Sequence, residues 1–366
     1  MADDLESYPT TEPDYAVPPG ETIREFLDDL GMSQRQLATR LDLTPKHVNQ
    51  LIQGLVPLSS EVALRLELVT GLSARMWNRL EADYQSTQRR LRQREDLAEL
   101  TSWLAEMPVR ELQSRGALPE QPKDKISRVQ QLLAFFGVAH VSTYREIYEK
   151  PAVRFRKAKA YEANPGAVAA WLRMGELAAY DKVCQPFDKH GLQESLDRLR
   201  QLTLQPPKVF FPIMRDICSR HGVAVVMIPE IKGARASGAT KWISPDKAMV
   251  LLSGRHKCDD QFWFTFFHEI AHVLKHGRSD VWIEDGHAIE DPRELQANQF
   301  AMDILIPPED AKRLPDLRTL AKAQAFAAEL GIAPSIVIGQ LHRKDILPYR
   351  VGQKFKRKID VADFEE

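Results

Sequence analysis

Hydrophobic residues recur with two different spacings along the chain, and each spacing predicts one kind of secondary structure. Residues 212–221 have a helical pattern, whereas the β-branched run at 223–228 is typical of a buried strand. Two further strands are predicted at 239–243 and 248–252, with the turn-forming sequence Ser-Pro-Asp-Lys between them. This order of elements predicts a small sheet that contains a hairpin.

A long apolar stretch follows the hairpin. Residues 262–274 contain neither proline nor glycine, and the pattern predicts a buried helix that ends in a glycine cap at Gly277. A second helix is predicted between Pro292 and Pro307, because proline is favoured in a first turn and cannot continue a helix. Its apolar stripe consists of Ala297, Phe300, Ala301, Ile304 and Leu305.

Short amphipathic helices are predicted near the amino terminus. Ser33 and Gln36 form a capping box that starts a helix over residues 34–41. After a short turn, Thr44 caps a second helix whose first residue is Pro45. Two short helices joined by a tight turn are typical of the helix-turn-helix motif. A supporting helix is expected from residue 59 or 60, with an inner face formed by Val62, Leu64, Leu66, Leu68 and Val69.

Together these patterns predict a mainly α-helical chain with a small β-sheet, which is an α+β fold. The expected segments are a disordered tail (1–18), a helix-turn-helix domain (19–85), a helical region for linking, sensing or dimerisation (86–205), a sheet-containing domain (206–310) and a helical appendage with a tail (311–366).

The composition narrows the classes to which the chain can belong. A net charge of −1 over 366 residues gives no bulk electrostatic attraction for nucleic acid or acidic lipid. Three scattered cysteines, Cys184, Cys218 and Cys258, lack the spacing of a disulfide framework and suit a reducing cytosol. No apolar run is long enough to span a bilayer, and no secretory signal opens the chain. We therefore expect a cytoplasmic protein without a membrane partner.

Candidate chemistry lies in the apolar helix, where His268, Glu269 and His272 form the motif H-E-x-x-H. Residues four apart share one helix face, about 6 Å apart along the axis. Two imidazoles at this spacing can bind one Zn²⁺, and the intervening glutamate can take a proton from water. The alternative is a pair of structural histidines in a core helix, where buried polar groups still need partners.

A catalytic zinc needs a third protein ligand. Glu294 is the candidate, and Asn298 shares its helix face, where it can hydrogen-bond a ligand histidine. His276 is about 12 Å along the helix axis from His268, too far to share one ion, so it is expected to orient a ligand instead. The alternative for Glu294 is a solvated side chain on a surface helix.

The second amino-terminal helix presents hydrogen-bonding side chains that can meet base edges and phosphates of DNA. The candidate DNA-binding residues are Gln34, Thr44, Pro45, Lys46, His47, Asn49 and Gln50. Acidic residues outnumber basic ones between residues 18 and 85, which weakens non-specific attraction to phosphates. A homodimer would double the contacts, and a helical protein-interaction module remains the alternative.

The motifs together resemble known families. Residues 268–272, Glu294, Ala297, Asn298, Phe300, Ala301 and 304–307 resemble the ImmA/IrrE family of zinc metallopeptidase-like proteins, and the similarity extends over roughly 206–345. Residues 32–38 and 49–54 are similar to Xre-type repressor domains, most closely those of HigA-like antitoxins. The first resemblance implies a gluzincin-like fold with one Zn²⁺ held by two histidines and a glutamate. It also implies a substrate-binding edge strand, which we assign to residues 248–253.

The leading hypothesis is a DNA-binding transcriptional regulator with a zinc endopeptidase domain, in which Glu269 is the general base. Its expected partners are operator DNA, a second copy of the chain, and a regulatory protein as substrate or a toxin. Candidates for an oxyanion donor are His256, His276 and His287. The alternative is a non-proteolytic antitoxin and autorepressor whose zinc domain binds a partner or senses a signal. A purely structural zinc is disfavoured by Glu269, because a closed site needs no base.

Overall fold

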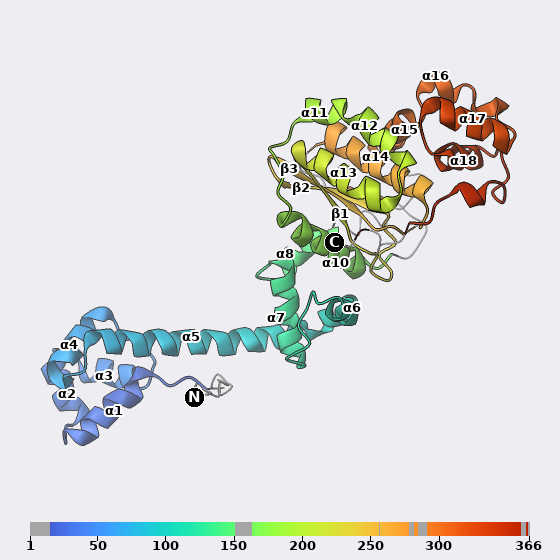
Figure 1. Ribbon diagram of the computed structural model, residues 1–366. Helices are drawn as coiled ribbons and strands as arrows, with labels where there is room; N and C mark the ends of the chain where they lie inside the picture. The colour runs from blue at the N-terminus through green and yellow to red at the C-terminus, as the bar shows by residue number, and fades with distance from the viewer. Residues whose placement is uncertain are drawn as a thin grey trace, which may run out of the picture. The chain divides into compact units, whose positions relative to one another are not determined.

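The computed structural model describes residues 15–150, 163–255, 257–277, 282–284, 291–359 and 364. The chain divides into two compact units, Met1–Thr101 and Ser102–Glu366. The expected disordered tail lies almost wholly outside the described residues. Helices predominate in both units, and a small sheet lies in the second, so the predicted α+β fold is confirmed (Figure 1).

All regular secondary structure of the first unit is helical where the unit is described. Its helices are α1 (Pro19–Asp29), α2 (Gln34–Leu41), α3 (Pro45–Ile52), α4 (Ser60–Thr70) and α5 (Ala74–Glu99). The core includes the fully buried side chains of Leu41, Ile52, Leu66 and Trp77. Because α5 begins inside the predicted helix-turn-helix segment and runs on to Glu99, one continuous helix crosses residue 85.

The predicted capping residues of the helix-turn-helix motif make the predicted hydrogen bonds. The backbone N–H of Ser33 donates to Gln36 Oε1 over 2.9 Å, and the N–H of Gln36 donates to Ser33 Oγ over 3.3 Å. Asp42 takes a left-handed conformation with φ of 53°, which ends α2 and makes the turn. Thr44 Oγ1 then accepts the N–H of His47 over 3.2 Å and starts α3.

The predicted inner face of α4 is confirmed at Val62 and Leu66 but is wrong at Leu64 and Leu68. The helix buries Val62, Ala63 and Leu66, whereas Leu64 is 60% and Leu68 is 88% exposed. A helix at the surface of a small bundle can turn only one stripe of its circumference toward the core. Leu64 and Leu68 are four residues apart and share the opposite face, so the core cannot accommodate them.

The second unit contains a four-stranded sheet in the order β1-β3-β2-β4. Its strands are β1 (Val223–Met227), β2 (Gly238–Ser244), β3 (Lys247–Leu252) and β4 (Trp282–Glu284). β1 pairs with β3 in parallel, while β2 pairs antiparallel with both β3 and β4. The hairpin is therefore confirmed, but the assignment of residues 248–253 to an edge strand is wrong. β3 pairs with β2 on one side and with the earlier strand β1 on the other, which places β3 inside the sheet.

Helices cover both faces of this sheet. Figure 1 shows α13 and α14 over one face and α10 against the other. The remaining described helices are α6 (Val109–Ser114), α7 (Lys125–Phe136), α8 (Val141–Tyr144), α10 (Pro165–Tyr180), α11 (Lys189–Glu194), α12 (Leu196–Gln201), α13 (Pro207–Arg220), α14 (Asp259–Lys275), α15 (Pro292–Leu305), α16 (Pro308–Ala311), α17 (Leu320–Leu330) and α18 (Pro334–Arg343). Short helices of 3-10 or π type complete the unit: η1 (Leu100–Glu106), η2 (Arg145–Glu149), η3 (Leu202–Leu204), η4 (Leu314–Asp316) and η5 (Gln353–Phe355).

Two helix ends differ from the prediction. α13 begins at Pro207 rather than residue 212, because Pro207 occupies the first helical position and Pro212 is tolerated inside the helix. α14 ends with His276 as its cap in an extended conformation, so the predicted glycine cap at Gly277 is wrong.

The carboxyl-terminal helices pack on α14. Ser335 Oγ on α18 donates to Asp259 Oδ2 over 2.8 Å, and the ammonium of Lys356 pairs with Asp260 Oδ2 at 2.5 Å. Both aspartates are buried at the start of α14. These polar contacts connect the predicted appendage to the helix that carries the H-E-x-x-H motif.

Candidate metal centre and nucleic-acid interface

α14 is buried along almost its whole length, because the sheet packs on one side and α15 and α18 pack on others. His268 and Glu269 are 0% exposed, and His272 is 1% exposed. Polar side chains in such a position need polar partners, since burying them alone is costly. The partners come from α15 and β2.

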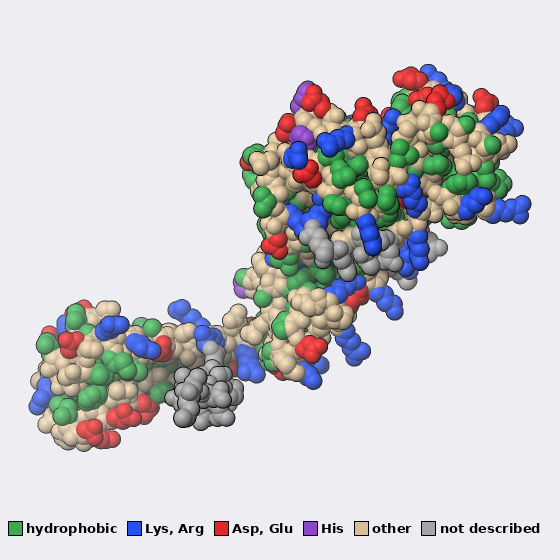
Figure 2. Space-filling view, in the orientation of Figure 1, with side chains coloured by type: hydrophobic (Ala, Val, Ile, Leu, Met, Phe, Trp, Pro, Cys, Tyr) green, Lys and Arg blue, Asp and Glu red, His purple; other side chains and the backbone are tan. Residues whose placement is uncertain are grey.

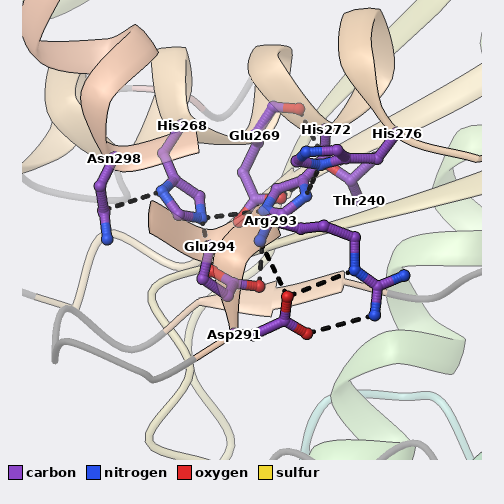
Figure 3. Close-up of polar contacts among 9 residues, drawn as sticks. All are labelled: Thr240, His268, Glu269, His272, His276, Asp291, Arg293, Glu294 and Asn298. Carbon is purple, nitrogen blue, oxygen red and sulfur yellow. Dashed lines mark hydrogen bonds and ion pairs between the residues drawn. The ribbon is translucent and has the colours of Figure 1, made fainter. Parts of the chain in front are cut away.

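The structure brings His268, His272 and Glu294 together across α14 and α15 (Figure 3). One potential ligand atom from each residue lies within 4.8 Å of the others. Nε2 of His268 is 3.0 Å from Nε2 of His272 and 3.1 Å from Glu294 Oε2. Nε2 of His272 is 3.6 Å from Glu294 Oε1. Glu294 is only 6% exposed, so it is not a solvated side chain on a surface helix.

Two further residues contact the outer nitrogens of these rings. Asn298 Oδ1 lies 3.1 Å from Nδ1 of His268, and Nδ1 of His276 lies 2.8 Å from Nδ1 of His272. A carbonyl oxygen can only accept, so Nδ1 of His268 donates to Asn298, and Nε2 is the nitrogen on the side of Glu294. The structure thus places both predicted orienting residues beside the histidines, each on the side away from Glu294 (Figure 3).

The electrostatics of the cluster favour the forms that bind a cation. Burial lowers the pKa of His272 to about 4, so the ring is neutral near pH 7. Burial alone would raise the pKa of Glu294, but hydrogen bonding to His268 and His272 brings it down to about 2. Imidazole nitrogens and a carboxylate form a donor set that zinc prefers. The residues present therefore fit a divalent zinc ion.

Glu269 is held from the side of the sheet. The hydroxyl of Thr240 on β2 lies 2.6 Å from Glu269 Oε2 and 3.1 Å from the backbone oxygen of Glu269. Gly238, two residues earlier on the same strand, leaves space for this carboxylate, because a Cβ there would lie 2.6 Å from Oε1. Sequence reasoning did not identify Gly238 or Thr240. Their only signal was a strand beside the helix, which does not give the register of the contact.

The predicted oxyanion donors are only partly described. His256 and His287 lie outside the described residues. His276 ends α14 and contacts His272 through Nδ1, and burial lowers its pKa. This contact places His276 behind the ring of His272, on the side away from Glu294.

The candidate DNA-binding residues all reach the surface of the first unit. Gln34, Thr44, Pro45, Lys46 and Asn49 are exposed, and His47 and Gln50 are half-buried. The buried side of α3 consists of Val48, Leu51 and Ile52. Both acidic and basic side chains appear on the face of this unit seen in Figure 2.

Comparison with known proteins gives two domain matches. Residues 23–77 match the helix-turn-helix family model, and residues 218–337 match the IrrE N-terminal-like domain of peptidase family M78. The second match includes β1 to β4, α14 and α15. Among the described residues, no helix has the length and apolar character needed to cross a membrane.

Two curated proteins are similar to shorter stretches of the chain. One is an uncharacterised HTH-type transcriptional regulator, YddM, of Escherichia coli K12, 36% identical over 63 residues, which are 17% of this chain and 67% of that protein. The other is virulence-associated protein I of Dichelobacter nodosus, 31% identical over 70 residues, 19% of this chain and 65% of that protein. Each match covers less than a fifth of this chain, so neither describes the whole protein.

Proposed function

We propose that this chain, which belongs to the HTH-type transcriptional regulators and carries an IrrE N-terminal-like domain, is a DNA-binding regulator with a zinc-dependent endopeptidase activity. The first unit would bind operator DNA through α3, as a homodimer. The second unit would bind one zinc ion and cleave a specific regulatory protein.

The observation that carries this proposal is the convergence of His268, His272 and Glu294 beside a buried glutamate. The three potential ligands come from two helices and lie within 4.8 Å of one another. A purely structural zinc is bound by four protein ligands, whereas the described residues offer three. Three ligands leave room for water, and a general base at Glu269 has a use only if water reacts.

The proposed roles follow from the geometry. Nε2 of His268, Nε2 of His272 and the carboxylate of Glu294 would hold Zn²⁺, which when bound lowers the pKa of water to about 7 and polarises a peptide carbonyl. Glu269 would accept the proton of the attacking water at its carboxylate and pass it to the departing amine nitrogen. Asn298 would keep the ring of His268 in the orientation that directs Nε2 toward Glu294.

The DNA-binding role is supported by the helix-turn-helix match and by the polar outer face of α3. α3 presents exposed Lys46 in its first turn and exposed Asn49 in its middle, which suit a phosphate and a base edge respectively. A regulator that binds DNA and cleaves a protein would couple proteolysis to transcription.

A Glu269→Gln variant tests the proposal against the non-proteolytic antitoxin and autorepressor. The amide cannot accept the proton from water, but it keeps the size of the side chain. We expect the variant to bind zinc and DNA as wild type does and to lose cleavage of its partner. Glu309→Gln, at an exposed position of α16, is the matched control and should change nothing. If wild-type protein and Glu269→Gln regulate transcription equally, the protein is a non-proteolytic regulator and the proposed endopeptidase function is wrong.

A further inference from the structure

β2 approaches α14 closely at the carboxylate of Glu269. Gly238 and Thr240 are two residues apart, so they point to the same face of the sheet. The hydroxyl of Thr240 lies 2.6 Å from Glu269 Oε2, and Thr240 is only 1% exposed. A Cβ at residue 238 would lie 2.6 Å from Glu269 Oε1 and 2.9 Å from its Cγ. Two residues of the strand therefore lie against the buried carboxylate, Thr240 beside Oε2 and Gly238 beside Oε1.

We infer that Thr240 is a positioning residue for Glu269 and holds its carboxylate in the orientation in which it accepts the proton. This inference rests on the proposed peptidase function. Thr240 holds Oε2 by donating its single hydroxyl proton. The carboxylate is then held between Thr240 and the backbone of Gly238, in one orientation relative to α14.

The alternatives for the Thr240 proton are limited. The hydroxyl can reach only two acceptors on Glu269, namely Oε2 at 2.6 Å and the backbone oxygen at 3.1 Å. A hydrogen bond to a charged acceptor is about twice as strong as one to a neutral acceptor, so the carboxylate is favoured. The backbone oxygen of Glu269 belongs to α14, and contact with it fixes the hydroxyl relative to the helix that carries the histidines.

The proton transfer then balances without further groups. An O–H bond of the attacking water breaks as an O–H bond forms on the carboxylate of Glu269, and the water oxygen forms a C–O bond with the peptide carbonyl carbon. The same proton later moves from the carboxylate to the amine nitrogen as the peptide C–N bond breaks. The proton of Thr240 stays on its own oxygen throughout, so Thr240 orients the base and does not react.

Three variants of the full-length protein separate this role from a structural one. Thr240→Val removes the hydroxyl while it keeps the shape, and Thr240→Ser keeps the hydroxyl while it loses a methyl group. Thr265→Val is the matched control, because Thr265 is also buried and its methyl group, Cγ2, lies 2.6 Å from where a Cβ of residue 238 would stand, as close as Glu269 Oε1. We expect all three variants to bind zinc as wild type does, since none alters a proposed ligand.

The first readout is the visible absorption of protein loaded with Co²⁺ in place of zinc, because the band responds to groups around the metal. We expect Thr240→Val to shift the band as Glu269→Gln does, and Thr240→Ser and Thr265→Val to leave it unchanged. The second readout is cleavage of a quenched-fluorescent peptide library. There Thr240→Val should lower kcat about 10- to 100-fold without changing KM, and Thr240→Ser should restore it.

Either of two results overturns the inference: a wild-type Co²⁺ band in Thr240→Val, or a Thr240→Ser variant as impaired as Thr240→Val. If the zinc-loaded wild-type protein cleaves neither the library nor its partner protein, the proposed peptidase function fails. The Co²⁺ band still decides in that case whether Thr240 positions Glu269.

Discussion

The side-chain oxygen of Asn298 lies 3.1 Å from Nδ1 of His268, on the opposite side of the ring from Glu294. This hydrogen bond joins α15 to α14 and makes Nδ1 of His268 the donor to Asn298, so Nε2 is the nitrogen that faces Glu294. The residue that orients His268 and the proposed ligand Glu294 therefore come from the same helix, one turn apart.

Replacing Asn298 should weaken zinc binding without abolishing it. Asn298→Ala removes the acceptor for Nδ1 of His268, so the ring can rotate or change tautomer. We expect the affinity for zinc to fall about 10- to 100-fold. Competition with a chromophoric chelator measures this change. Gln299→Ala, at the next position of α15, should retain wild-type affinity, since Gln299 is exposed and donates a hydrogen bond to Asp303 of the same helix. Equal affinities of both variants would contradict the role of Asn298.

A side chain at residue 238 should push Glu269 from its position. In Gly238→Ala the new Cβ would approach both the carboxylate and Cγ2 of Thr265 to 2.6 Å. Overpacking of this kind costs about 1–3 kcal/mol of unfolding free energy. Urea unfolding of the zinc-free protein measures the loss. Gly277→Ala is the control, because a Cβ there meets nothing within 4 Å, and its unfolding free energy should match that of wild type. A Gly238→Ala variant as stable as wild type would show that the strand can move away.

The zinc-free protein should lose stability in mild acid through His272. Burial lowers the pKa of this ring from 6.5 to about 4, so between these values the unfolded state binds a proton that the folded state does not. Stability is therefore highest above pH 6.5 and falls as the pH drops toward 4. The full contribution is about 3 kcal/mol.

The difference in unfolding free energy between wild type and His272→Gln reports this contribution together with the effect of His272 on the pKa of Glu294, and both are lost as the pH falls. We expect the difference to fall by about 2–3 kcal/mol between pH 7 and pH 4.5. Burial raises the pKa of Asp259 to about 6, so the folded state gains stability from protonation of Asp259 as the pH falls. Because Asp259 is present in both proteins, its contribution cancels in the difference. A difference that stays constant over this range would mean that His272 titrates alike in the folded and unfolded states.

Substitutions on α3 should separate sequence recognition from charge. Asn49→Ala should cost about 1–3 kcal/mol on a selected operator duplex and little on random DNA. Lys46→Gln should weaken both kinds of complex and reduce the slope of log affinity against log salt by about 1. Fluorescence anisotropy at several salt concentrations measures both effects. If neither variant alters binding, α3 does not enter the groove.

The amino-acid sequence determined those features of the protein that depend on neighbours within about one helical turn. The Ser33–Gln36 capping box, the Thr44 cap and the spacing of His268 and His272 each involve residues three or four apart. Such contacts form whenever the local helix forms, so the pattern alone predicts them. The bounds of α15 were predicted for the same reason, since proline lies at one end and just beyond the other.

Tertiary structure alone decided how separate elements meet. Leu64 and Leu68 have the apolar character of core residues, yet α4 turns them outward because only one of its faces meets the bundle. Strand β3 lies inside the sheet because it pairs with β1 on one side and with β2 on the other. Thr240 meets Glu269 only through the register between β2 and α14. Packing geometry across distant segments sets these contacts, and no local spacing in the chain encodes it.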